Sequence, residues 1–217
     1  MREPSLQVPT DRAALLAFAL EACGFDPERR VRLGSEATRH ALDWEAAAPG
    51  EVASYFLMMP GHLAVFKETI EGELSGFGTF EVLAGQEGAV ARATIEQREA
   101  RGDRYTYDVI RTAEGVAAEV KGKRNLVAHD WIWRFPIQER AWTEELDETT
   151  VSFQLYFVEG PVEVEAGRFH GCLRLSTVNE NGSSSHTYHP KAGLILSEFT
   201  DVEGTPGRRE LFDLLLV

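Results

Sequence analysis

Short runs of alternating apolar and polar residues limit the fold of this chain more than any other feature. Successive side chains of a β-strand point to opposite faces, so each run places one face on a core and the other toward water or a cavity. The clearest runs are residues 89–96, 105–109, 116–121 and 151–157. Residues 63–66 are apolar at every position, and we expect both faces of that strand to be buried.

Turn-forming pairs that contain glycine separate these runs. They occur at residues 75–76, 102–103, 114–115 and 181–182. Because no helical pattern lies between the runs, they favour antiparallel pairing over parallel β-α-β units. An apolar segment over residues 211–217 is expected to form a last strand. We therefore predict a mainly β (α+β) fold, a twisted antiparallel sheet or half-open barrel preceded by an N-terminal helical segment.

The first 50 residues follow a helical pattern instead. Thr10 can cap a helix that runs to about Cys23, and Gly24 suits the position after its end. From these patterns we predict a helical segment, residues 1–50, that packs on an antiparallel β-domain of residues 51–217 with two loosely repeated halves.

The charge balance restricts the partners of the chain. Its 217 residues include 35 acidic and 22 basic side chains, which gives a net charge of −13. This balance repels phosphate and anionic membrane surfaces, so we expect no nucleic-acid partner. No apolar stretch reaches the length of a membrane span, and the N-terminus lacks a clear signal peptide, so we expect a cytoplasmic protein. The two cysteines, Cys23 and Cys172, are expected to be buried free thiols, with a disulfide only if the chain is exported.

Four segments resemble, in their order and spacing, a broad group of uncharacterised bacterial β-rich proteins, many of them secreted or lipoproteins. YFLMMPGH at Tyr55–His62 resembles the opening element YFPLxxGxxW of that group, and FPIQERAW at Phe135–Trp142 resembles its second element FPLxxGxxW. VEAGRFHGCLRL at Val164–Leu175 is similar to a VPAGxFxxCLxV strand, and YHPKAGLI at Tyr188–Ile195 looks like a YYAPGVGLV hairpin. The resemblance covers about residues 53–217.

The resemblance implies a twisted antiparallel sheet or half-open barrel, and it implies no reaction. The shared residues are turn glycines, prolines and core aromatic residues, which determine backbone geometry rather than chemistry. The chain departs from the group in its N-terminal helical segment, in its lack of a signal peptide and in Arg140, where the second element has glycine.

The sequence contains no nucleophile elbow, phosphate-binding loop, HExxH or EF-hand motif. Gly76 and Gly78 begin a Gly-x-Gly, but Glu81 occupies the third glycine position and no β-α-β unit surrounds them. We therefore expect no nucleotide site, no metal and no other cofactor.

Three histidines are the candidate catalytic residues. His186 and Tyr188 share one face of a predicted strand, while His189 points to the other face. If the strands over residues 169–177 and 185–196 pair, His170 can approach His186 or His189. Two histidines and a carboxylate can hold zinc or support hydrolysis. The simpler interpretation is that these are ordinary polar-face histidines near a hairpin.

Four aromatic residues are the candidate ligand-binding residues: Trp133, Tyr105, Tyr107 and Phe153. They can line a cavity inside a half-open barrel, since inward-facing positions of such a barrel need not be filled by side chains. The alternative is that they are ordinary core residues.

Three functions remain open from the sequence. The first is a non-enzymatic binding or assembly module for an apolar small molecule or a protein partner. The second is a hydrolase with a site near the C-terminal histidines. The third is a structural subunit that forms a homo-oligomer through edge strands.

Overall fold

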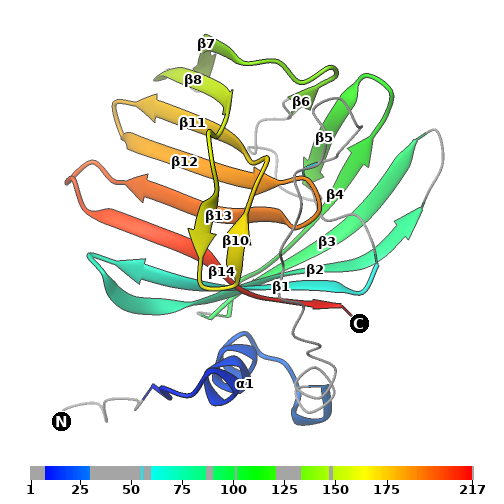
Figure 1. Cartoon of the computed structure of the whole chain (residues 1–217), viewed down its shortest axis with the longest axis vertical. Coiled ribbons are helices and arrows are strands. Elements are labelled where there is room, and N and C mark those ends of the chain that lie inside the picture. The colour runs from blue at the N-terminus through cyan, green and yellow to red at the C-terminus, as the bar shows by residue number, and fades with distance from the viewer. Residues whose placement is uncertain are drawn as a thin grey trace.

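The computed structural model describes residues 8–29, 55, 60–86, 90–100, 102–120, 133–146 and 149–216. Most of this chain forms one antiparallel sheet of 12 strands, preceded by the helix α1 (Figure 1). A two-stranded hairpin, β9–β10, is separate from the sheet and adds Val162 and Phe169 to the interior cluster of apolar side chains. The predicted fold class is confirmed.

The helix and the first seven strands are α1 (Arg12–Ala22), β1 (His62–Ile70), β2 (Glu73–Gln86), β3 (Ala91–Glu99), β4 (Arg104–Arg111), β5 (Gly115–Val120), β6 (Trp133–Arg134) and β7 (Arg140–Leu146). The remaining strands are β8 (Thr149–Phe157), β9 (Val162–Val164), β10 (Gly167–Phe169), β11 (Leu173–Asn179), β12 (Gly182–His189), β13 (Gly193–Thr200) and β14 (Pro206–Leu216).

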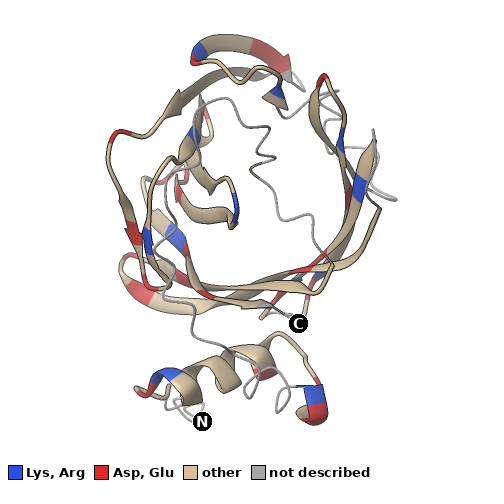
Figure 2. Cartoon of the chain, turned by 45° about the vertical axis from the view of Figure 1, so that its right-hand side comes forward, with Lys and Arg blue, Asp and Glu red and all other residues tan. Residues whose placement is uncertain are grey.

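The order of strands in the sheet is β6-β5-β4-β3-β2-β1-β14-β13-β12-β11-β8-β7. Strands β1 to β6 therefore form one meander. Strands β7, β8, β11, β12, β13 and β14 form a second, from which the hairpin β9–β10 is separate. The two meanders meet where the first strand, β1, pairs antiparallel with the last strand, β14. The sheet curls strongly, so that Figure 2 shows it as an incomplete ring with α1 outside. Its concave side encloses the interior cluster of apolar side chains.

Strand β1 is buried on both faces, as its apolar run predicts. Ala64 and Phe66 face the interior of the curved sheet, while Leu63 and Val65 face the layer under α1. All four side chains are fully buried. This strand therefore separates two apolar layers, one on each side of the sheet.

Helix α1 begins one residue later than the sequence predicts. Its N-cap is Asp11, not Thr10, and the Asp11 carboxylate accepts a hydrogen bond of 2.9 Å from the amide of Ala14. A carboxylate accepts more strongly than a hydroxyl, which explains the preference for the aspartate. At the other end, the predicted role of Gly24 is confirmed: it has φ +75°, and its amide donates to the carbonyl of Glu21.

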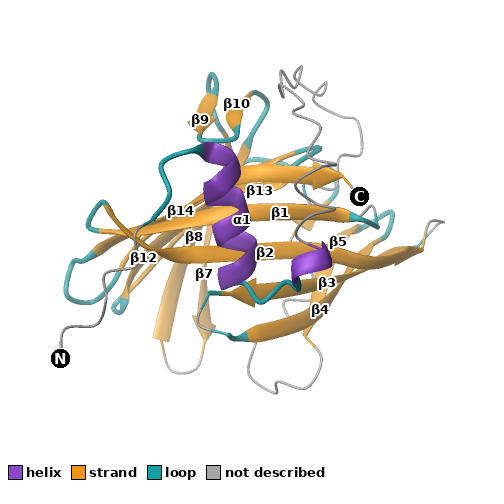
Figure 3. Cartoon of the chain, turned by 90° about the horizontal axis from the view of Figure 1, so that it is seen from below, coloured by secondary structure: helices purple, strands orange, loops and turns teal. Residues whose placement is uncertain are grey.

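The helix lies across the outer face of the sheet, over β1, β2 and β14 (Figure 3). Its side chains Leu16, Ala19 and Leu20 are buried there against sheet residues that include Phe77 and Phe212. The predicted boundary between the helical segment and the β-domain, at residue 50, lies outside the described residues. No described helix has the length and apolar character needed to cross a membrane.

Both cysteines are buried free thiols, as predicted. Cys23 lies in the apolar layer under α1 and Cys172 in the interior cluster. Burial is the main reason that the pKa of each thiol is raised to about 12. Neither is therefore suited to act as a nucleophile at neutral pH.

Candidate functional site

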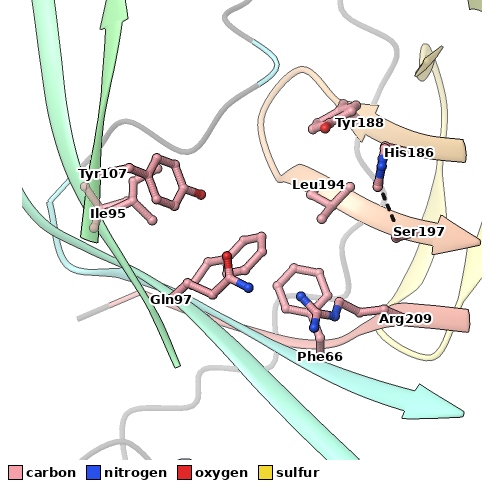
Figure 4. A pocket seen from close by; sticks show the side chains of 11 residues that line it. Phe66, Ile95, Gln97, Tyr107, His186, Tyr188, Leu194, Ser197 and Arg209 are labelled. Atoms are coloured by element: carbon pink, nitrogen blue, oxygen red, sulfur yellow. Dashed lines mark hydrogen bonds between the residues drawn. The ribbon is translucent and has the colours of Figure 1, made fainter. Parts of the chain in front are cut away.

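A cavity of about 280 Å³ lies on the concave side of the sheet. Seven strands supply its lining: Phe66 from β1, Phe80 and Val82 from β2, Ile95 and Gln97 from β3, Tyr107 from β4, His186 and Tyr188 from β12, Leu194 and Ser197 from β13, and Arg209 from β14. The cavity thus spans the junction of the two meanders (Figure 4). Its volume is just below the range of about 300–1,000 Å³ that is common for small-molecule sites.

Most of the wall is apolar. The rings of Phe66 and Phe80 contact each other with centroids 4.9 Å apart and planes inclined by 52°. Val82 and Ile95 are buried beside them, and Leu194 closes the opposite side. Such a wall favours an apolar body over water.

Two tyrosines add polar tips to this apolar wall. Burial is the main cause that raises the pKa of Tyr107 and of Tyr188, so both phenols stay protonated and can donate hydrogen bonds. Trp133 lies behind Tyr188, with ring centroids 5.0 Å apart and planes at 81°. The tryptophan, which is fully buried, therefore holds a lining residue in position.

A histidine and a serine form a polar pair on the wall. The ring nitrogen Nδ1 of His186 lies 2.9 Å from Oγ of Ser197, because the two residues are directly opposite each other on β12 and β13. Burial, and after it the positive charge of Arg209, lowers the pKa of His186. The imidazole is therefore neutral at neutral pH.

Arg209 carries the charge at the cavity. Its Nη2 lies 2.9 Å from Oε2 of Glu99 and also forms an ion pair with Glu68, which is its direct cross-strand partner on β1. Gln97 donates a hydrogen bond to Glu99. Burial raises the pKa of Glu68, Arg209 acts in the opposite direction, and Glu99 raises it again. Two carboxylates therefore share one guanidinium.

The Gly-x-Gly of the sequence has a structural role at this cluster. Gly78 is opposite Phe66 on β1 and Gly76 is opposite Glu68. A Cβ at Gly78 would lie 2.9 Å from Oε2 of Glu99 and 3.4 Å from Oε1 of Glu68. The missing side chains thus make room for the two carboxylates behind Arg209.

The structure brings one of the four predicted ligand-binding residues into the cavity lining. Tyr107 lines the cavity, and Trp133 lies one layer behind it. Tyr105 is half-buried beside Gln97, its cross-strand partner. Phe153 stacks on Trp142, with centroids 5.0 Å apart and planes inclined by 7°. No ligand tests these assignments, and they stay predictions.

The three candidate histidines do not share one site: His170 lies close enough to His189 for its charge to lower the pKa of His189, while His186 lines the cavity. The expected strands over residues 169–177 and 185–196 are each interrupted, the first between β10 and β11 and the second between β12 and β13. His170 falls in the first break and is exposed. His189 ends β12 and is buried against Phe169, with centroids 5.3 Å apart. His186 alone of the three lines the cavity.

Metal binding finds no support at these histidines. Burial, with smaller effects of Lys191 and His170, lowers the pKa of His189 to about 4. Its Nδ1 accepts hydrogen bonds from the backbone amides of Lys191 and Ala192 at 3.2 and 3.3 Å. Within the described ranges, no group of three or more His, Cys, Asp or Glu side chains is placed to hold a metal ion.

Several residues that line the cavity, among them Gln97 and Arg209, were not predicted from the sequence. Gln97 lies two residues after Ile95 on an alternating strand, so the period-two pattern was sufficient to place it on the inner face. Arg209 gave no such signal, because the last strand was expected to begin at residue 211 and instead begins at Pro206. The charged run before residue 211 has no apolar alternation that marks it as a strand.

Six chains of solved structures are similar to this protein, among them two bacterial proteins. One is a Bacteroides fragilis protein provisionally described as exported and as having a YmcC-like fold; it has 14% identity and a TM-score of 0.49, with 75% of this chain and 99% of that chain covered. The other is a protein of Parabacteroides distasonis provisionally described as a lipoprotein, with 12% identity, a TM-score of 0.46 and coverage of 75% and 98%. No family model and no curated protein matches the sequence.

The cytoplasmic location expected from the sequence is withdrawn, since the two similar proteins are described as an exported protein and a lipoprotein; these descriptions are statements about those two proteins. That expectation rested on the N-terminal residues and on the lack of an apolar stretch long enough to span a membrane. The comparison is one of overall structure and does not test the four segments on which the resemblance was based.

Proposed function

We propose that the protein binds a small, mostly apolar molecule inside the curved sheet. The observation that carries this proposal is the cavity of about 280 Å³, which is lined mainly by apolar and aromatic side chains from seven strands. Sites for small molecules commonly combine an apolar wall with a few polar groups, and this cavity has both.

Energetics support occupancy of the cavity. The cavity is open on one side, so water can enter it. A ligand that covers the apolar wall removes this wall from water, which contributes about 25 cal/mol for each Å² of apolar surface buried.

A protein partner on the N-terminal helix has less support. The large apolar side chains of α1 are directed to the sheet, and its exposed positions include the small residues Ala13, Ala14 and Ala17. Large exposed apolar patches are what mark such partners. Edge-to-edge assembly through β7 is also disfavoured, because this edge strand carries Glu144 and Glu145.

Hydrolysis at the C-terminal histidines has less support for a different reason. That function requires at least two of His170, His186 and His189 to converge with a carboxylate. The described structure places His170 at an exposed break, His189 against Phe169, and His186 in the cavity.

Titration with the neutral apolar fluorophore N-phenyl-1-naphthylamine tests the proposal. The Leu194→Trp substitution fills the cavity from β13 and is expected to weaken binding of the fluorophore by at least about tenfold. The matched control is Leu83→Trp, which adds the same side chain at an exposed position of β2 and should bind as the wild type does. Circular dichroism of both variants checks that they fold.

Two results would refute the proposal. One is that the fluorophore does not bind the wild-type protein. The other is that Leu194→Trp and Leu83→Trp weaken binding equally. Native mass spectrometry of the purified protein adds an independent measurement, because a molecule retained from the expression host appears as a mass increment that the Leu194→Trp variant should lose.

A further inference from the structure

The chemistry of the polar wall restricts what kind of molecule fits the cavity. Among the described lining residues, Arg209 is the charged one, and His186 beside it is neutral at neutral pH. Glu68 and Glu99 do not line the cavity; they lie behind Arg209, in the space left by Gly78. A ligand therefore meets a guanidinium whose charge is already compensated.

A negatively charged ligand group is disfavoured at this position. A carboxylate placed on Arg209 would become the third negative group around one guanidinium, because Nη2 of Arg209 already pairs with both Glu68 and Glu99. These pairs are partly buried, with side-chain exposures of 22% for Arg209, 25% for Glu68 and 16% for Glu99. Screening by water is weaker in such surroundings than in bulk solvent.

A positively charged ligand group is disfavoured as well. The described lining offers it no carboxylate, because Glu68 and Glu99 lie behind Arg209 and pair with it. The ligand group would also lose its own hydration on entering an apolar cavity, without a partner that compensates for the loss.

A neutral oxygen acceptor fits the remaining donors. A guanidinium carries five N–H groups, and in the described part of the chain both ion pairs of Arg209 use Nη2. The N–H groups on Nη1 and Nε are left to donate to a ligand. The side chain of Gln97 on β3 and the hydroxyl of Ser197 on β13 also line the cavity, from different sides (Figure 4).

Resting on the proposed function, we infer that the bound molecule is uncharged and presents an oxygen acceptor, as an alcohol, ester or amide does, to Arg209. Its apolar body then lies against Phe66, Phe80 and Ile95. A fatty acid or an alkyl amine with the same apolar body should bind more weakly, because its head group is charged.

Displacement of N-phenyl-1-naphthylamine by three matched compounds at pH 7.5 tests this inference. We expect 1-octanol to displace the fluorophore at a concentration at least about tenfold lower than octanoate or octylamine, because a charged head group loses its hydration in the cavity and finds no uncompensated charge of opposite sign there.

Two variants separate the local effect from the general preference of apolar sites for neutral compounds. Glu99→Gln removes one negative charge behind Arg209 and keeps the shape, so we expect it to strengthen octanoate binding about tenfold and leave 1-octanol unchanged. The matched control is Glu96→Gln, which removes the same charge from the outer face of the same strand, where Glu96 pairs with Arg98. This control should change neither compound. Glu68→Gln replaces Glu99→Gln if the latter does not fold.

The outcomes distinguish this inference from the proposed function. Octanoate or octylamine that competes as well as 1-octanol, or equal effects of Glu99→Gln and Glu96→Gln on octanoate, would overturn the inference and leave the apolar site in place. Failure of the fluorophore to bind the wild-type protein would overturn both.

Discussion

Phe77 joins helix α1 to the outer face of the sheet, and its replacement by leucine has a cost that the structure allows us to predict. The ring is 2% exposed and packs edge-on against Phe18 of α1 and Phe212 of β14, at centroid distances of 6.0 and 6.5 Å. An aromatic pair contributes about 0.5–1.5 kcal/mol beyond the area that it buries. Since leucine retains most of the apolar contact but neither ring pair, Phe77→Leu should lower the free energy of unfolding by about 2 kcal/mol.

Urea denaturation followed by intrinsic fluorescence measures this change. With a slope of about 3 kcal/mol per M, expected for a chain of this size, the midpoint should fall by roughly 0.7 M. The matched control is Phe80→Leu on the inner face of the same strand, where the ring borders the cavity and has Phe66 as its one aromatic neighbour among the described residues. We expect its midpoint to fall about half as far.

The comparison of the two variants decides whether the reasoning is correct. Equal midpoints for Phe77→Leu and Phe80→Leu, or no loss of stability for Phe77→Leu, would refute the contribution of the two ring pairs. Loss of amide protection confined to α1, with the sheet unchanged, would show instead that the helix undocks as a separate unit.

Three further predictions concern single residues. Gly182 has φ +130°, and a Cβ there would lie 2.1 Å from the carbonyl oxygen of Thr200 on the neighbouring strand. Gly182→Ala should therefore lower the melting temperature by about 10 °C. The control is Gly160→Ala, at φ +78° with open space around it, which should lower the melting temperature by only about 3 °C. Burial lowers the pKa of His189 from 6.5 in the unfolded chain to about 4, so the free energy of unfolding should fall by up to about 3 kcal/mol as the pH falls from 6.5 to 4. His189→Asn should flatten this pH dependence, which urea denaturation at several pH values measures. Cys23 and Cys172 should not react with a disulfide reagent such as DTNB in the native protein and should both react in guanidinium chloride; rapid native labelling would contradict their burial.

The fold could be predicted because its strongest signals are local. Alternation over residues 105–109 and 151–157 appears in the structure as strands β4 and β8. The unbroken apolar run at residues 63–66 corresponds to a strand with an apolar layer on each side. Such patterns follow from the geometry of a single strand, so they need no knowledge of which strands are neighbours.

The cavity could not be assembled in this way because its residues meet through long-range pairing. Arg209 reaches Glu68 only because β14 lies against β1, and no local pattern predicts that register. The position of His170 was hard to predict for a related reason: the expected strand over residues 169–177 breaks between β10 and β11, and His170 lies exposed in that break. A one-residue error in a strand boundary reverses the face of every side chain that follows.

The pairing of the first strand with the last one has a consequence for how the chain folds. All neighbours in the sheet apart from β1 with β14 and β8 with β11 are consecutive strands, so each meander can form from local contacts soon after it is synthesised. The edge of β1 that faces away from β2 then stays unpaired until β14 has been synthesised. Pairing of β14 with this edge closes a loop that spans the whole sheet. Joining of the two meanders is therefore expected to be the slow step of folding. It also completes the outer surface on which α1 packs, because Phe212 and Leu215 of that surface belong to β14.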